Sequence, residues 1–168
     1  MDTATTAQAK MISARGYSLR SIASRSQPVA HQTQTLPRAW QFTAMRNAYQ
    51  ESGGLMRAPD LASLWQGHGV SDTHLLTQWI QNRQVISFEW QATTWLPMVQ
   101  FNRSTMTLVP GFEAIQAELV AVYNDCDVAQ WFSLPNTWLV DRSPASALHH
   151  DAPEVLMAAR AERCVSAR

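Results

Sequence analysis

The apolar residues between positions 38 and 83 recur every three or four positions, a spacing that predicts three consecutive helices. The first spans 38–51 and ends before Gly53-Gly54, the second opens at Pro59-Asp60, and the third begins with Ser71 as its N-cap. The residues expected to face the core are Trp40, Ala44, Met45, Ala48 and Tyr49, then Leu61, Leu64 and Trp65, then Leu75, Leu76, Trp79 and Ile80.

The apolar period changes to two after residue 84, which predicts a β-hairpin. Ile86, Phe88 and Trp90 alternate with polar residues in the first strand. A second strand with a similar alternation, from Trp95 to Phe101, follows a tight connection at 92–94.

Helical spacing returns after Pro110-Gly111 and predicts a second, wholly helical module. Caps and prolines divide this segment into four helices. The expected helix starts are Phe112, then Asp125 or Asp127, then Ser143-Pro144, then Asp151 with Pro153.

We therefore expect a mainly α protein with one β-hairpin, built from three parts. A basic, disordered tail covers 1–37, a winged-helix-like module of three helices and the hairpin covers 38–108, and a small helical bundle covers 109–168. An organellar transit peptide is the alternative for the tail, because Met11–Ser26 combines arginines and serines with no acidic residue.

Charge is segregated along the chain although the formal net charge is zero. The first 57 residues contain seven basic and two acidic residues, and the remainder contains six basic and eleven acidic residues. A basic first third attracts phosphate, whereas an acidic remainder suits a protein-facing or solvated surface. Two cysteines and no membrane-length apolar run indicate a cytoplasmic protein.

The sequence offers no convincing catalytic or metal site. His68, Ser71 and Asp72 lie too close together in the sequence for a hydrolase triad, and a turn and a helix cap explain them. Cys126 lies between two aspartates that oppose thiolate formation, and His149-His150 has no further metal ligands in sight. We expect a protein that is not an enzyme and that uses no metal or cofactor.

The third predicted helix is a candidate for contact with DNA. Three helices followed by a hairpin are the element order of a winged helix-turn-helix, whose third helix enters the major groove. On the face opposite the apolar stripe lie His74, Gln78, Gln81 and Arg83, and the amides are suited to adenine.

The C-terminal third resembles the toxin-binding domain of the Xre/MbcA/ParS antitoxin family. The resemblance rests on Trp131–Leu139, on Ser143-Pro144 to Leu148 and on Val155–Arg160, and it covers roughly Val109 to the C-terminus. These segments supply, in order, a tryptophan helix, a Pro-Asn turn, a Ser-Pro helix start and a final alanine-rich helix. The segment Leu96–Phe101 is similar, less specifically, to a hairpin that precedes this domain in some members.

The resemblance implies a bacterial antitoxin that binds and sterically inhibits a toxin of the RES or ParT kind, enzymes that consume NAD or transfer ADP-ribose. It implies homo-oligomers or hetero-oligomers with that toxin. Arg160, Arg163 and Arg168 would form the toxin-binding surface. The residues that match the motif and are expected to hold the shape of the bundle are Trp131, Phe132, Pro135, Asn136, Trp138, Leu139 and Pro144. Where the family commonly has glycine, this chain has Asp141, so we expect the turn there to differ.

The alternative function is a DNA-binding transcriptional regulator whose C-terminal domain dimerises. It follows from the basic tail and the winged-helix element order, with promoter DNA as the partner.

Overall fold

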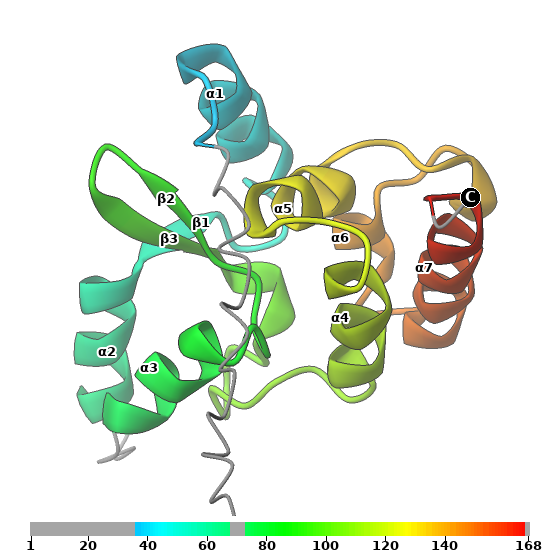
Figure 1. Ribbon diagram of the computed structural model, residues 1–168. Helices are drawn as coiled ribbons and strands as arrows, with labels where there is room; N and C mark the ends of the chain where they lie inside the picture. Colours follow the sequence, from blue (N-terminus) through cyan, green and yellow to red (C-terminus); the bar gives the residue numbers. More distant parts are fainter. Residues whose placement is uncertain (1–35, 68–72, 167–168) are drawn as a thin grey trace, which may run out of the picture. The chain divides into compact units, whose positions relative to one another are not determined.

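Over residues 36–67 and 73–166, which the computed structural model describes, the chain forms mainly helices and one small antiparallel sheet (Figure 1). The expectation of a mainly α protein containing a β-hairpin is thereby confirmed. The interpretations of residues 1–35 as a tail or transit peptide, of His68, Ser71 and Asp72, and of Arg168 lie outside the described residues. Within those ranges no helix has the length and apolarity needed to cross a bilayer.

The first half contains the sheet, and one of its strands was missed by the sequence analysis. The strand Leu55–Arg57 (β1) has only three residues and pairs with the second hairpin strand, giving the order β1-β3-β2. The other elements of this half are α1 (Ala39–Ala48), α2 (Ala58–Gly67), α3 (Thr73–Gln81), β2 (Phe88–Trp90), β3 (Thr93–Pro97) and the 3-10 turn η1 (Met98–Gln100).

The hairpin is shorter than predicted, and its turn lies earlier. Trp90 pairs with Thr93, so the loop consists of Gln91 and Ala92 rather than 92–94. Both loop residues have positive φ, 49° and 56°, as a type I′ turn requires. The second strand ends at Pro97, and the buried residues Val99 and Phe101, which we expected in this strand, lie in and just after η1.

The second half is helical as predicted. Its elements are α4 (Phe112–Val120), α5 (Asp125–Ser133), the 3-10 turn η2 (Thr137–Leu139), α6 (Pro144–Ala147) and α7 (Ala152–Ser166). Ser143 caps α6, with its Oγ accepting from Ser146 N at 3.2 Å. The cap of α5 is Asn124 rather than an aspartate, since its Oδ1 accepts from Asp127 N at 3.0 Å.

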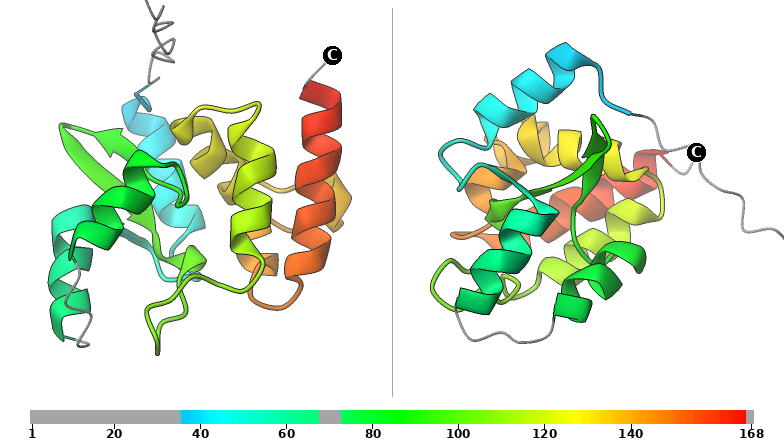
Figure 2. Two further views of the ribbon diagram at one scale, coloured as in Figure 1. Left: turned by 60° about the horizontal axis from the view of Figure 1, so that its bottom comes forward. Right: turned by 90° about the vertical axis from the view of Figure 1, so that its left-hand side faces the viewer.

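The sheet separates two apolar clusters (Figure 2). We call the first the larger core cluster; it joins α1, one face of the sheet and the inner sides of the C-terminal helices. The second, the smaller core cluster, joins α2 and α3 to the other face of the sheet. Adjacent strand residues contribute to different clusters: Trp95 packs against the larger one and Leu96 belongs to the smaller one.

Helix α1 packs on α5 and on the sheet. Met45 and Tyr49 are buried in the larger core cluster, and the Tyr49 hydroxyl donates to the carbonyl of Ala129 in α5 at 2.6 Å. Phe42 stacks on Trp90 with a centroid distance of 5.0 Å. Of the residues predicted to face the core, Met45 and Tyr49 are therefore buried as expected, whereas Ala44 and Ala48 are exposed and Trp40 is 62% exposed.

Candidate functional site

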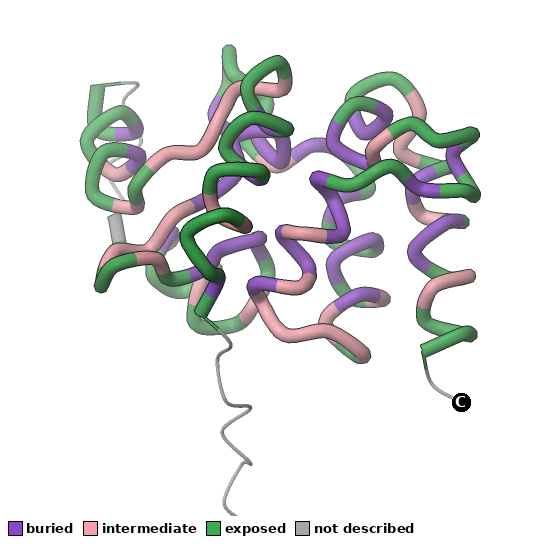
Figure 3. The backbone as a smooth tube through the Cα atoms, turned by 90° about the horizontal axis from the view of Figure 1, so that it is seen from above, coloured by how far each residue is buried: buried purple, intermediate pink, exposed green. Residues whose placement is uncertain are grey.

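The last helix has one buried and one exposed side. Val155, Ala158 and Ala159 are buried and pack toward α4, which explains the small residues at these positions. The opposite side of α7 is open to solvent, as the alternation of buried and exposed segments in Figure 3 shows. Outside the buried stripe, Met157, Arg160, Arg163 and Val165 are exposed, and the two arginines lie at the border with α4.

Two arginines of this exposed side share one carboxylate. Glu118 of α4 accepts from Arg163 Nη1 at 2.8 Å and from Arg160 Nε at 3.4 Å. The hydrogen bond from Arg163 lowers the pKa of Glu118 below its ordinary value; partial burial opposes this effect and the bond from Arg160 adds to it. The side chain of Arg163 is 52% exposed and that of Arg160 is 55% exposed. Two cations held against one anion leave a local surplus of one positive charge where α7 meets α4.

A second acidic residue fixes the orientation of α7 around its axis. One carboxylate oxygen of Glu162 accepts a hydrogen bond from the hydroxyl of Tyr123. The other oxygen accepts a hydrogen bond from Trp131 Nε1 at 3.4 Å. Because Trp131 belongs to α5, these bonds tie the last helix to the tryptophan helix of the motif. Packing and polar contacts together therefore hold α7 so that Arg160 and Arg163 stay at the protein surface.

The Pro-Asn turn between α5 and α6 is organised by Asn136. Its side chain accepts from Trp138 N at 2.9 Å, and its carbonyl accepts from the amides of Leu139 and Asp141 at 3.0 Å each. Asp141 has a φ of +60°, so the aspartate adopts the left-handed backbone that glycine favours, and Val140 before it has a φ of +55°.

The motif residues divide into a buried and an exposed group. Trp131, Phe132, Asn136, Leu139 and Pro144 are buried, in keeping with a role in shaping the bundle. Pro135 is exposed, and so is Trp138, at 60%. Packing therefore does not account for the indole of Trp138.

Two further exposed apolar residues lie close to Trp138 in the sequence. Leu134 and Val140 lie at either side of Trp138 in the sequence and are also exposed. Sequence analysis assigned Trp138 to packing and did not single out the other two. The only signal was the low number of polar residues between Leu134 and Val140.

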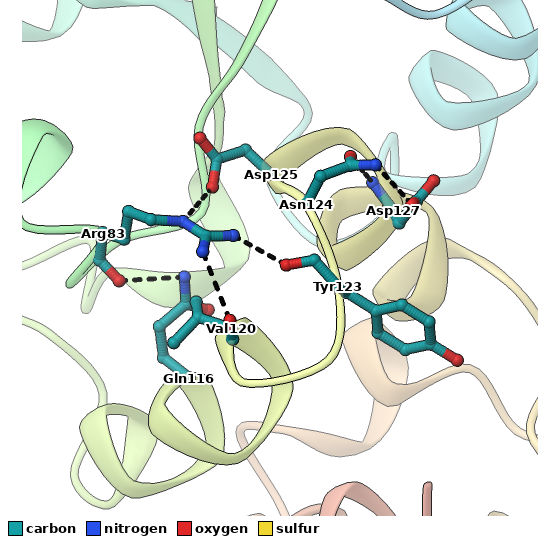
Figure 4. Close-up of polar contacts among 7 residues, drawn as sticks. All are labelled: Arg83, Gln116, Val120, Tyr123, Asn124, Asp125 and Asp127. Carbon is teal, nitrogen blue, oxygen red and sulfur yellow. Dashed lines mark hydrogen bonds and ion pairs between the residues drawn. The ribbon is translucent and has the colours of Figure 1, made fainter. Parts of the chain in front are cut away.

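The four residues proposed for DNA contact are not all together on one surface. His74, Gln78 and Gln81 are exposed on α3, and His74 lines a cavity of about 550 Å³ with Thr93 and Thr94 of the hairpin. Arg83 instead turns toward the C-terminal helices (Figure 4). Its guanidinium pairs with Asp125 and donates to the carbonyls of Val120 and Tyr123.

The reactive residue types of the described chain show no shared centre. No three histidine, cysteine or acidic side chains within the described ranges are grouped so that they could hold a metal ion. Burial and the carboxylates of Asp127 and Asp125 raise the pKa of the Cys126 thiol to about 11, which confirms that this cysteine is not activated.

The chain was also compared with known proteins. No protein-family model, curated protein or solved structure matches it significantly.

Proposed function

We propose that this chain is an antitoxin-like protein that binds and sterically inhibits a toxin of the RES or ParT kind, an enzyme that consumes NAD or transfers ADP-ribose. The observation that carries the proposal is the pair Arg160 and Arg163 of α7, two exposed side chains that share Glu118 of α4. Guanidinium groups are suited to carboxylates and phosphates, the groups expected in and around an NAD pocket.

The C-terminal bundle supplies rigidity for this role. The inner side of α7 is buried against α4, and Glu162 ties it to Trp131 and Tyr123. A surface that is ordered before binding loses less conformational entropy when a partner docks. The exposed indole of Trp138 is a further anchor of the residue type that dominates binding energies at interfaces.

Substitution of the two arginines tests the proposal better than deletion of the helix. Deleting α7 would remove Val155, Ala158 and Ala159 from the larger core cluster and unfold the bundle. In the Arg160→Gln/Arg163→Gln variant we expect at least about tenfold weaker capture of a RES or ParT toxin. We expect little change in melting temperature, because exposed ion pairs contribute only about 0–1 kcal/mol.

Arg57 provides the matched control. It is likewise ion-paired and about as exposed, with Asp60 as its partner, but it belongs to β1. The Arg57→Gln variant should capture the toxin and suppress its NAD consumption as the unmodified chain does. Equal affinity of the double variant and this control would contradict the assignment of the surface to α7.

A second candidate function is DNA-binding regulation, favoured by one observation. His74, Gln78 and Gln81 are exposed on α3, and the hairpin lies beside that helix across the cavity that His74 lines. The packing of α1 on α5 and the internal contacts of Arg83 weigh against it. Binding to upstream promoter DNA should then fall steeply with salt, and no gel retardation in dilute buffer would refute it.

A further inference from the structure

A cavity of about 570 Å³ gathers basic side chains from segments that are far apart in the sequence. The loop after η1 contributes Arg103, and the segment joining α6 to α7 contributes His149 and His150. One acidic side chain, Glu51 from the turn after α1, also lines the cavity. The surface proposed above for toxin binding is not part of its lining. Its volume is in the range of small-molecule sites.

Gly53 leaves room for the guanidinium of Arg103 in its present position. A Cβ atom at Gly53 would come within 2.7 Å of Arg103 Nη2 and 3.3 Å of its Nε. Any other residue would therefore have to displace the guanidinium. Gly53 also has a φ of +114°, which side chains with a Cβ rarely adopt.

The guanidinium of Arg103 is not used by the fold. Five other arginines, at positions 57, 83, 142, 160 and 163, pair with carboxylates. Arg103 forms no ion pair and no side-chain hydrogen bond with any part of the chain that the structure describes, although Glu51 lines the same cavity. Its planar set of donors is thus available to an external group.

We propose that this cavity binds a small phosphate ester. The fork of Arg103 contacts two phosphate oxygens, and N–H groups of His149 and His150 donate to the same group from the opposite segment. The Glu51 carboxylate is an acceptor within the same cavity, which suits a ligand that also carries hydroxyl groups. The chemistry favours a phosphate over a carboxylate because three donor side chains line one cavity and a phosphate ester offers three oxygens to them, whereas a carboxylate offers two.

Isothermal titration calorimetry on the full chain tests this site, with inorganic phosphate, ribose 5-phosphate, ribose and succinate as probes. We expect ribose 5-phosphate to bind more tightly than inorganic phosphate, and ribose and succinate to give no binding heat. The Arg103→Gln variant should bind ribose 5-phosphate at least about tenfold more weakly. The His149→Gln/His150→Gln variant should also bind more weakly.

Arg46→Gln is the matched control. Arg46 is exposed on α1, has no ion-pair partner among the described residues and does not line the cavity. This variant should bind ribose 5-phosphate like the unmodified chain. The proposal is overturned if neither phosphate probe binds the unmodified chain, if succinate binds as well as they do, or if Arg103→Gln and Arg46→Gln behave alike. Circular dichroism confirms that each variant is folded.

Discussion

Arg83 and Asp125, 42 residues apart in the sequence, form an ion pair with an Nε–Oδ1 distance of 2.5 Å (Figure 4). Arg83 ends α3 in the left-handed conformation, with a φ of +54°. Its amide bonds to the carbonyl of Ile80, and the next amide bonds to that of Trp79, the pattern of a Schellman motif. Glycine is the usual residue there, so arginine at this position is explained by its side-chain contacts.

Replacing Arg83 should therefore destabilise the fold, even when the new residue is glycine, which adopts the left-handed backbone conformation without strain. The Arg83→Gly variant loses the ion pair and two bonds to carbonyls near the end of α4, those of Val120 and Tyr123. We expect a loss of about 2 kcal/mol in the free energy of unfolding, measured by urea denaturation. The Arg83→Lys variant keeps the charge without the fork and should fall in between. Full stability of Arg83→Gly would refute the capping role.

The two adjacent glycines after α1 should respond differently to alanine. At Gly53 the added Cβ would lie 2.9 Å from Met98 Cβ, in addition to its contact with Arg103. At Gly54, with a φ of +78°, no atom lies within 4 Å. We expect Gly54→Ala to lose about 1 kcal/mol and Gly53→Ala to lose clearly more, as measured by thermal unfolding. Equal losses would contradict the close packing around Gly53.

Two substitutions in the hairpin loop should stabilise the fold. Gln91 and Ala92 both have positive φ, a conformation that Asn-Gly adopts with less strain. The Gln91→Asn/Ala92→Gly variant should raise the free energy of unfolding by about 1 kcal/mol. Chemical denaturation measures this gain, and a loss of stability would argue against the two-residue turn.

The two cysteines should differ in reactivity. Cys126 is buried with a pKa raised to about 11, whereas Cys164 is exposed on α7. Iodoacetamide at pH 8 should therefore modify Cys164 first, and Cys126 only after unfolding, because the thiolate is the nucleophile. Mass spectrometry of peptides with and without denaturant reports both sites. Comparable labelling of both in the folded protein would contradict the burial of Cys126.

The contact between Arg163 and Glu118 should make stability depend on pH. A carboxylate whose pKa is lowered by folding stabilises the protein above its unfolded pKa, and this contribution disappears as pH falls through the lower, folded pKa. Arg163→Gln should therefore lower the melting temperature at pH 7 by a small amount, as expected for an exposed ion pair, and this difference from the unmodified chain should shrink below about pH 4. A difference that does not change with pH would show that the carboxylate is not involved.

Much of the helical architecture follows from local patterns. The apolar spacing identified the helices, and Ser143-Pro144 marked the start of α6 correctly because a hydroxyl cap and a proline act on the backbone locally. The strand β1 was missed because three residues are too few to show an alternation. Its pairing depends on β3, about forty residues further along the chain.

The buried side of α1 illustrates what a pattern leaves undecided. Trp40 and Phe42 both have apolar neighbours at helical spacing, so periodicity alone does not choose between their sides of the helix. The choice is made by the aromatic surface of the sheet, where Phe42 stacks on Trp90. Tertiary contacts of this kind are not encoded in the spacing.

The candidate site was predictable in part. The exposure of Arg160 and Arg163 follows from the apolar stripe of α7, but their common partner Glu118 lies on another helix. The side chain of Arg83 points toward the C-terminal helices because its φ is positive, and no local residue pattern predicts a positive φ at an arginine. The convergence of Arg103 with His149 and His150 depends on how distant loops meet.

The division of β3 between two clusters also bears on how the molecule melts. Trp95 and Leu96 are consecutive, yet opening either cluster would strip one face of the same short strand and release its partners β1 and β2. Loss of the aromatic packing on the sheet face that belongs to the larger core cluster would therefore also destabilise α2 and α3, which pack on the other face. We therefore expect residues 36–67 and 73–166 to unfold as a single cooperative unit, because excising either half would leave an unpaired apolar sheet face in water.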